Sequence, residues 1–200
     1  MRNLMVFSLF FWAVTGEANQ FVQDLVAAGH ERTQHSVRYD GAYVAIDYPG
    51  GDVPKNTGVC TDVIVRAYRA LGTDLQQLVH EDMLLNFDDY PSKRIWGLSQ
   101  PDSHIDHRRV PNLQAFFRRH GRSLKVSKNS ADYHPGDLVT WMLPGNLPHI
   151  GIVSDQVNAH TSQPMIIHNI GRGPVLEDML FRYKVTGHYQ YLPINYKAQR

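Results

Sequence analysis

The chain has 200 residues, a net charge of +1, 42% hydrophobic residues and 20% charged residues. This length fits one domain, and the composition is that of a globular protein rather than a disordered one. The charge is nearly balanced and forms no basic stripe, so we expect no nucleic-acid partner.

The first residues of the chain have the features of an export signal. Arg2 supplies a positive charge, and residues 4–14 form an almost unbroken apolar run. Gly16 and Ala18 are small residues at the spacing that signal peptidase requires. We therefore expect cleavage after Ala18 and a periplasmic or secreted mature protein.

Cleavage there divides the chain into a signal peptide, residues 1–18, and one mature domain, residues 19–200. The alternative is an uncleaved N-terminal anchor. The apolar run is short for a membrane span, which favours cleavage and predicts no stable membrane anchor afterwards. A monomer is expected.

Helical spacing of apolar residues dominates the first part of the chain, and short strand-like runs dominate the rest. The predicted helices cover residues 19–31, 60–71, 74–86 and 111–120, with a long polar loop over residues 87–109. The predicted strands are Leu138–Leu143, His149–Ser154, Met165–Ile170 and Val185–Leu192. This order predicts an α+β fold with N-terminal helices packed on an antiparallel β-sheet.

Cys60 is the single cysteine and lies in the first turn of a predicted helix. It has no partner for an internal disulfide, so it is either buried and inert or retained for its reactivity. The unpaired N–H groups of a helix N-terminus stabilise a thiolate, and such cysteines have pKa values of roughly 3.5–7.5. The same N–H groups can hold an oxyanion. Position alone therefore predicts an activated nucleophile that needs a histidine partner.

Two histidines lie on neighbouring predicted strands. His149 opens one strand and His168 ends the next. Adjacent antiparallel strands can bring such side chains within hydrogen-bond reach. Each histidine taken alone also fits a structural role at the rim of a sheet.

Five short segments occur in an order that resembles a known family. They are Tyr48-Pro49-Gly50-Gly51, Cys60 at the start of an apolar helix, His134-Pro135-Gly136-Asp137-Leu138-Val139, His149-Ile150-Gly151-Ile152-Val153 and Ile167-His168. Together they resemble the NlpC-type branch of the papain-like cysteine peptidases over about residues 39–192. The chain is most similar to a bacterial family of unknown function within that superfamily.

The resemblance implies a papain-like (NlpC-type) fold and a Cys-His-His mechanism. Cys60 would be the nucleophile and His149 the general base, oriented by His168, with Asn169 as the alternative third group. Tyr48 and Asp62 are expected to contribute to substrate binding.

The nucleophile segment Val59-Cys60-Thr61-Asp62 differs from the usual Asp-Cys-Ser-Gly of that superfamily. The long segment between Gly72 and Val110 is also unlike its compact members. We expect this segment to build one wall of the substrate cleft.

Two polar clusters contain metal-type ligands, His80-Glu81-Asp82 and His104-x-Asp106-His107. Neither has the spacing of a zinc helix motif, so we expect no metal and no cofactor. Arg108 and Arg109 could bind a substrate carboxylate, and a surface salt bridge is the alternative.

The predicted function is that of an exported cysteine hydrolase that cleaves an amide bond in peptidoglycan peptides. A cell-wall peptide or another amide would be its partner. Two alternatives remain: an acyl transferase or thioesterase acting on a substrate other than peptidoglycan, and a catalytically silent module that binds the cell envelope.

Overall fold

The computed structural model describes residues 7–194 and 196, with side chains from residue 16 onward. The α-helices are α1 (Phe7–Arg32), α2 (Cys60–Ala70), α3 (Leu75–Asn86), α4 (Ser92–Trp96) and α5 (Val110–His120). Short 3₁₀ helices are η1 (Phe87–Asp89), η2 (Asp106–Arg108) and η3 (Ser130–Asp132). The strands are β1 (Arg38–Tyr39), β2 (Thr57–Gly58), β3 (Arg122–Ser123), β4 (Leu138–Leu143), β5 (Leu147–Val157), β6 (Pro164–His168), β7 (Val175–Glu177) and β8 (Lys184–Gln190).

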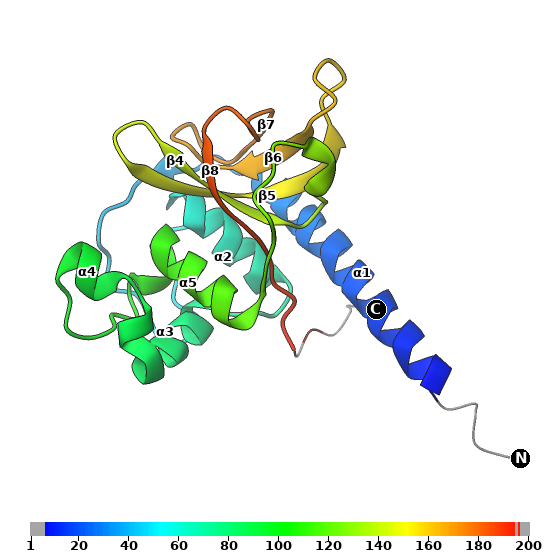
Figure 1. Ribbon diagram of the computed structural model, residues 1–200. Coiled ribbons are helices and arrows are strands. Elements are labelled where there is room, and N and C mark those ends of the chain that lie inside the picture. The colour runs from blue at the N-terminus through cyan, green and yellow to red at the C-terminus, as the bar shows by residue number, and fades with distance from the viewer. Residues whose placement is uncertain (1–6, 195, 197–200) are drawn as a thin grey trace, which may run out of the picture.

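The main sheet has the strand order β3-β8-β4-β5-β6-β7, and every neighbouring pair is antiparallel. Helices α2, α3, α4 and α5 gather on one side of this sheet, and α1 runs along its flank (Figure 1). A separate parallel pair, β1 and β2, joins the loop before α2 to the segment after α1. The predicted α+β class, with helices on an antiparallel sheet, is confirmed.

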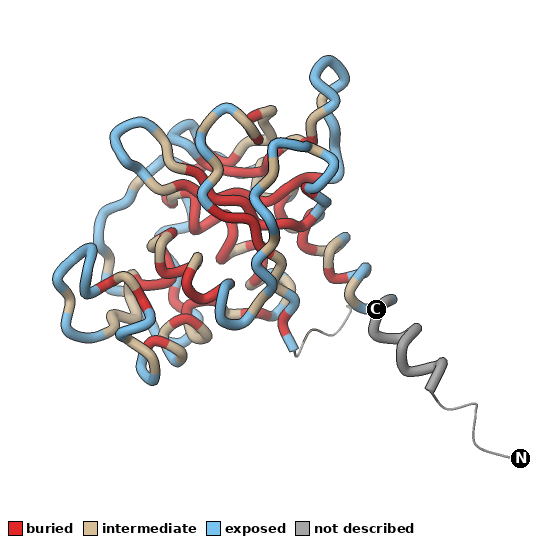
Figure 2. The backbone as a smooth tube through the Cα atoms, in the orientation of Figure 1, coloured by how far each residue is buried: buried red, intermediate tan, exposed pale blue. Residues whose placement is uncertain are grey.

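The central strands of the sheet are buried on both faces. Successive side chains along a strand point to opposite faces, and apolar residues occur in both sets, so each face packs against its own core. The larger core lies between the helices and the sheet and includes Leu138, Ile150 and Ile167. The smaller core lies on the opposite face and includes Val139 and Trp141. Figure 2 shows the buried backbone concentrated in the sheet and in the helices beneath it.

Gly151 permits the close approach of β5 and β6. A Cβ atom at this position would lie 2.6 Å from Cγ2 of Ile166 and 3.1 Å from Cβ of His168. A side chain there would therefore push β6 away from β5. The glycine in the His149–Val153 segment thus brings the two histidine-bearing strands together.

The prediction of a continuous polar loop over residues 87–109 is wrong. This segment contains η1, α4 and η2. Ser92 is fully buried and donates from Oγ to Asn112 Oδ1 at 3.1 Å, which ties α4 to α5. Gly97 ends α4 in the left-handed conformation at φ 65°, where glycine is favoured. Tertiary packing of a polar sequence, rather than apolar periodicity, orders this region.

The predicted helix over residues 19–31 is part of the longer α1, which starts at Phe7. Residues 1–6 of the predicted signal peptide lie outside the described residues, as do the side chains of residues 7–15. Within the described part of the chain, no helix combines the length and apolarity needed to cross a membrane. Export and cleavage after Ala18 stay predictions.

Candidate active site

The N-terminus of α2 carries the candidate nucleophile. Cys60 is the first residue of the helix, which confirms the prediction that it lies in the first turn, and Val59 is the N-cap. Asp62 accepts a hydrogen bond from the Val59 N–H at 2.6 Å, so it satisfies one of the unpaired donors at the helix start. The local sequence therefore fixes where the helix begins and where the thiol lies.

Asp62 is also half of a buried ion pair. Arg108 donates from Nε to Oδ1 at 2.9 Å and from Nη2 to Oδ2 at 3.0 Å. Both side chains are about 4% exposed. Arg108 donates further to the carbonyls of Ala42 and Asp40, each at 3.3 Å. Asp62 was predicted to bind substrate, but both of its carboxylate oxygens accept hydrogen bonds from other residues of the protein. In the structure its role is to stabilise the N-terminus of α2.

A cleft of about 370 Å³ opens beside the thiol. Its lining residues are Tyr39, Gly41, Val59, Cys60, Trp96, Ile105, Arg108, Arg109, Val110, Pro111 and Pro148. The segment between Gly72 and Val110 supplies four of these residues and so forms part of the wall of this cleft, while binding of substrate there stays a prediction. Tyr48 is not among them, although it was predicted to bind substrate. Its ring packs against His80 at 4.9 Å instead.

Burial dominates the ionisation of Cys60. The thiol is 4% exposed, and burial raises its pKa to about 12. The N–H groups of Ile150, Thr61 and Cys60 itself favour the thiolate, while the charge of Asp62 opposes it. The predicted lowering of the thiol pKa is therefore wrong, because desolvation outweighs the helix N-terminus.

The thiol lies where β5 and β6 stop pairing. It is beside the N–H of Ile150, whereas the β5–β6 register starts at Ile152 and Ile167. Asn169 follows β6, and its Nδ2 donates to the carbonyl of Gly58, just before α2, at 3.5 Å. The start of α2 thus lies beside Ile150 of β5 and Asn169, the residue after β6.

Three buried or half-buried side chains form a hydrogen-bonded row on β5, β6 and β7. Nε2 of His149 lies 3.0 Å from Nδ1 of His168, and Nε2 of His168 lies 3.1 Å from Oε2 of Glu177. Arg182 donates to Oε1 of Glu177 at 2.6 Å. We call His149, His168 and Glu177 the imidazole row. His168 is thereby the histidine partner of His149, while Asn169 bonds elsewhere.

The imidazole row is neutral at its histidines and charged at its carboxylate. Burial lowers the pKa of His149 to about 3, with a further contribution from His168. Burial also lowers the pKa of His168. For Glu177, burial raises the pKa, but the hydrogen bond and charge of Arg182 outweigh it, and the pKa is lowered overall. The His149 ring is hydrogen-bonded to His168. A contact between the His149 ring and the Cys60 thiol stays a prediction.

Sequence reasoning missed several members of the site. Glu177 lies in a three-residue strand with no recognisable motif, and only the β6–β7 register places it beside His168. Tyr39 lies in the two-residue strand β1, and its pKa is raised to about 12 by burial and by the nearby Cys60. The one signal available for Tyr39 was an aromatic residue in the irregular chain before the cysteine.

Comparison with known proteins decides the family. A model of a domain of unknown function, DUF1287, matches residues 26–191. The chain belongs to the DUF1287 family. A relative described as uncharacterized protein YijF, from Escherichia coli (strain K12), is 55% identical over 153 residues, which cover 76% of this chain and 73% of the relative. The range matched by the DUF1287 model contains Cys60 and the whole imidazole row.

Some residues of the other polar clusters of this DUF1287 protein have structural partners, whereas Nδ1 of His80 and Nδ1 of His107 are buried without a hydrogen-bond partner in the part of the chain that the structure describes. Nδ1 of His104 contacts the backbone of Ile46, and Asp82 accepts hydrogen bonds from Tyr90 and Arg119. Among the described residues, no three His, Cys, Asp or Glu side chains are grouped to hold a metal ion. Arg108 and Arg109 both line the cleft, but the guanidinium of Arg108 is held in the buried ion pair with Asp62.

Arg109 forms part of the cleft wall together with Trp96. Its guanidinium lies 4.4 Å from the centre of the Trp96 ring, and Nη1 donates to Asp106 Oδ1 at 2.8 Å. The side chain is 17% exposed. A cation stacked on an aromatic ring and held by one carboxylate keeps further N–H donors for a ligand.

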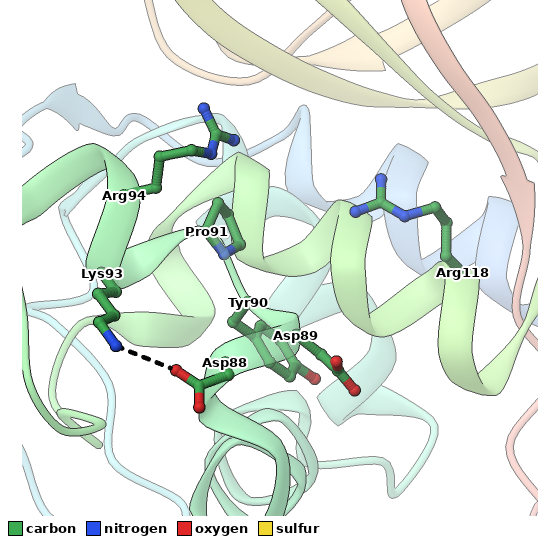
Figure 3. A pocket seen from close by; sticks show the side chains of 7 residues that line it. All are labelled: Asp88, Asp89, Tyr90, Pro91, Lys93, Arg94 and Arg118. Atoms are coloured by element: carbon green, nitrogen blue, oxygen red, sulfur yellow. Dashed lines mark hydrogen bonds and ion pairs between the residues drawn. The ribbon is translucent and has the colours of Figure 1, made fainter.

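A second hollow, of about 330 Å³, lies between η1, α4 and α5 (Figure 3). It is lined by Asp88, Asp89, Tyr90, Pro91, Lys93, Arg94 and Arg118. Lys93 pairs with Asp88 at 3.4 Å, and both side chains are largely exposed. None of the predicted site residues lines this hollow, whereas Cys60 lines the first cleft.

Proposed function

We propose that this protein is a cysteine hydrolase that cleaves an amide bond, with Cys60 as the nucleophile and His149 as the base. The observation that carries the proposal is the imidazole row ending at the strand that borders the Cys60 cleft. Cys60 lines the cleft and lies beside the N–H of Ile150, the residue that follows His149, and His149 is itself held by a second polar group. A cysteine, a histidine base and a group that orients the base are the three parts that nucleophilic acyl transfer requires. The order of these residues in the chain supports a papain-like, NlpC-type fold.

The neutral states of Cys60 and His149 suggest how the reaction proceeds. As the sulfur attacks the substrate carbonyl carbon, the thiol proton passes to His149, so no isolated thiolate forms in the buried site. The N–H of Cys60 holds the oxyanion. His149 then protonates the leaving amine as the C–N bond breaks, and later activates water to hydrolyse the thioester. His168 and the Glu177 carboxylate stabilise the transient imidazolium.

The composition of the cleft supports a peptide substrate that carries carboxylates. Arg109 and Trp96 provide a cationic and aromatic wall, and Tyr39 also lines the cleft. Peptidoglycan peptides have this chemistry, and the export features of residues 1–18 would bring the protein to them. Periplasmic or secreted localisation is therefore part of the proposal.

The raised thiol pKa favours one alternative, a catalytically silent module that binds the same peptides. The two functions differ in a single observable, since both bind the peptide and only the hydrolase releases product. A thioesterase or acyl transferase would use the same residues on a different acyl donor.

The proposal is tested with purified peptidoglycan peptides and a panel of amide and thioester substrates. We expect turnover by the full-length chain, loss of about 1000-fold or more in Cys60→Ala and His149→Ala, and a smaller loss in His168→Ala. His160→Ala, at an exposed histidine in the loop before β6, is the matched control and should keep wild-type turnover.

Wild-type turnover by Cys60→Ala on a substrate that the protein cleaves would refute the assignment. Binding of the peptides by the wild-type chain without any product would support the silent module instead.

A further inference from the structure

We infer that Glu177 is a positioning residue that fixes the protonated nitrogen of His149 as Nε2 and so leaves Nδ1 as the basic nitrogen. This inference deepens the proposed function and rests on it in one respect: Nδ1 would be the atom that accepts the thiol proton. The assignment of the proton itself follows from the hydrogen bonds alone.

The argument starts at the carboxylate, where the direction of hydrogen bonding is fixed. Oε1 of Glu177 accepts from Arg182, and Oε2 lies 3.1 Å from Nε2 of His168. An ionised carboxylate only accepts hydrogen bonds. Nε2 of His168 must therefore carry a hydrogen, because no other atom in this contact can donate.

The same assignment of donors and acceptors then fixes the tautomer of His149. A neutral imidazole has one N–H and one bare nitrogen. Since His168 carries its hydrogen on Nε2, its Nδ1 is bare and can only accept. Nε2 of His149 lies 3.0 Å from that atom and must donate to it. The single proton of neutral His149 is then on Nε2, and Nδ1 holds a free lone pair.

The opposite arrangement is disfavoured by the same contacts. A proton on Nδ1 of His168 would leave the lone pair of Nε2 facing the Glu177 carboxylate. His168 is fully buried, so water has little access to relieve this repulsion. Arg182 also donates to the carbonyl of Asp178 at 3.1 Å, which holds the guanidinium against Glu177. One carboxylate, kept ionised by its arginine, thus sets the tautomers of two histidines.

The position of Glu177 suits this role. It lies on β7, which pairs with β6 so that His168 is opposite Val175 and Ile166 is opposite Glu177. Its side chain is 34% exposed, so the carboxylate remains partly hydrated while it contacts a buried ring. Glu177 does not line the cleft, and it acts only through His168.

The test is the ¹⁵N NMR spectrum of histidine-labelled full-length protein near neutral pH, with rings assigned by single-histidine substitutions. In the wild-type protein we expect His149 and His168 both protonated on Nε2 and bare on Nδ1. In Glu177→Met, which has no strong acceptor, both rings should become tautomer mixtures. On a substrate that the protein cleaves, kcat should fall about 10- to 100-fold with KM unchanged.

Two variants separate positioning from a general structural effect. Glu177→Gln has one carbonyl oxygen, which accepts from Arg182, so its amide N–H₂ faces Nε2 of His168; both histidines should shift to the tautomer protonated on Nδ1, and kcat should fall. Arg182→Ala keeps the carboxylate and should retain the wild-type tautomers. If Glu177→Met fails to fold, the spectra of the wild-type protein and Glu177→Gln still decide the matter.

A wild-type His149 protonated on Nδ1, or a folded Glu177→Met with unchanged tautomers, overturns the inference. Failure of the proposed function looks different, because a wild-type chain that cleaves no amide can still show the tautomers expected here.

Discussion

The two halves of the candidate site are built in different ways. On the sheet side, His149, His168 and Glu177 form a continuous row of hydrogen bonds that ends in an ion pair with Arg182. On the helix side, Cys60 is buried, and its pKa is raised to about 12. The proposed base is therefore held in place before any ligand binds, whereas the proposed nucleophile is a neutral thiol.

This difference indicates where activation must come from. A buried neutral thiol resists oxidation, which would protect the single cysteine in the proposed periplasmic or secreted location. Deprotonation then has to be coupled to attack on a bound carbonyl. In the proposed mechanism, the reaction begins when the correct substrate binds, and it does not depend on a thiolate that is already present in the free protein.

The largest effect that we expect is a loss of folding stability when the buried ion pair at the start of α2 is broken. Asp62→Ala leaves Arg108 buried without its partner and removes the acceptor for the Val59 N–H. Loss of one partner from a buried ion pair costs about 3–5 kcal/mol of the free energy of unfolding. Denaturant unfolding measures this cost, and Asp88→Ala, which removes the exposed pair with Lys93, should show no measurable change. Equal effects of the two variants would contradict the structural role of Asp62.

The next effect concerns thiol reactivity in the free protein. Alkylation uses the thiolate, and a pKa near 12 lowers the thiolate fraction at pH 8 about 2000-fold relative to free cysteine. Higher nucleophilicity of a more basic thiolate recovers roughly 40-fold of this loss. We expect iodoacetamide to modify Cys60 at least ~50-fold more slowly than free cysteine at pH 8, with the rate rising as pH increases. If Cys60 in the folded protein were modified as fast as free cysteine, its thiol would not be held in the neutral state, and the difference between the helix side and the sheet side of the candidate site would be contradicted.

The smallest effect separates two tyrosines. Tyr39 lines the cleft and Tyr48 does not. Removing the hydroxyl in Tyr39→Phe should lower kcat/KM by about 2- to 10-fold, the range for one hydrogen bond. Tyr48→Phe should change it by less than about 2-fold, as at other positions outside a site. A larger loss in Tyr48→Phe would restore the role that the sequence alone suggested for it.

Sequence reasoning located the elements of the site but not their electrostatics. The helix beginning at Cys60 and the strands carrying His149 and His168 follow from local apolar patterns and were predicted with small boundary errors. The thiol pKa was predicted with the wrong sign, because burial depends on packing between α2 and β5 that no local pattern encodes. Glu177 was missed because its contact with His168 depends on the register between two strands. Asp62 and Arg108 were both noted in the sequence, but their pairing spans 46 residues of the chain.

The most direct measurement is the intact mass of the full-length chain during turnover of a peptide substrate in excess, followed by mapping of any adduct. The account predicts a transient acyl group on Cys60 in the wild-type protein. It predicts neither adduct nor product in Cys60→Ala, and an adduct that forms far more slowly in His149→Ala. Product release by Cys60→Ala at the wild-type rate would contradict the central claim that this cysteine is the nucleophile.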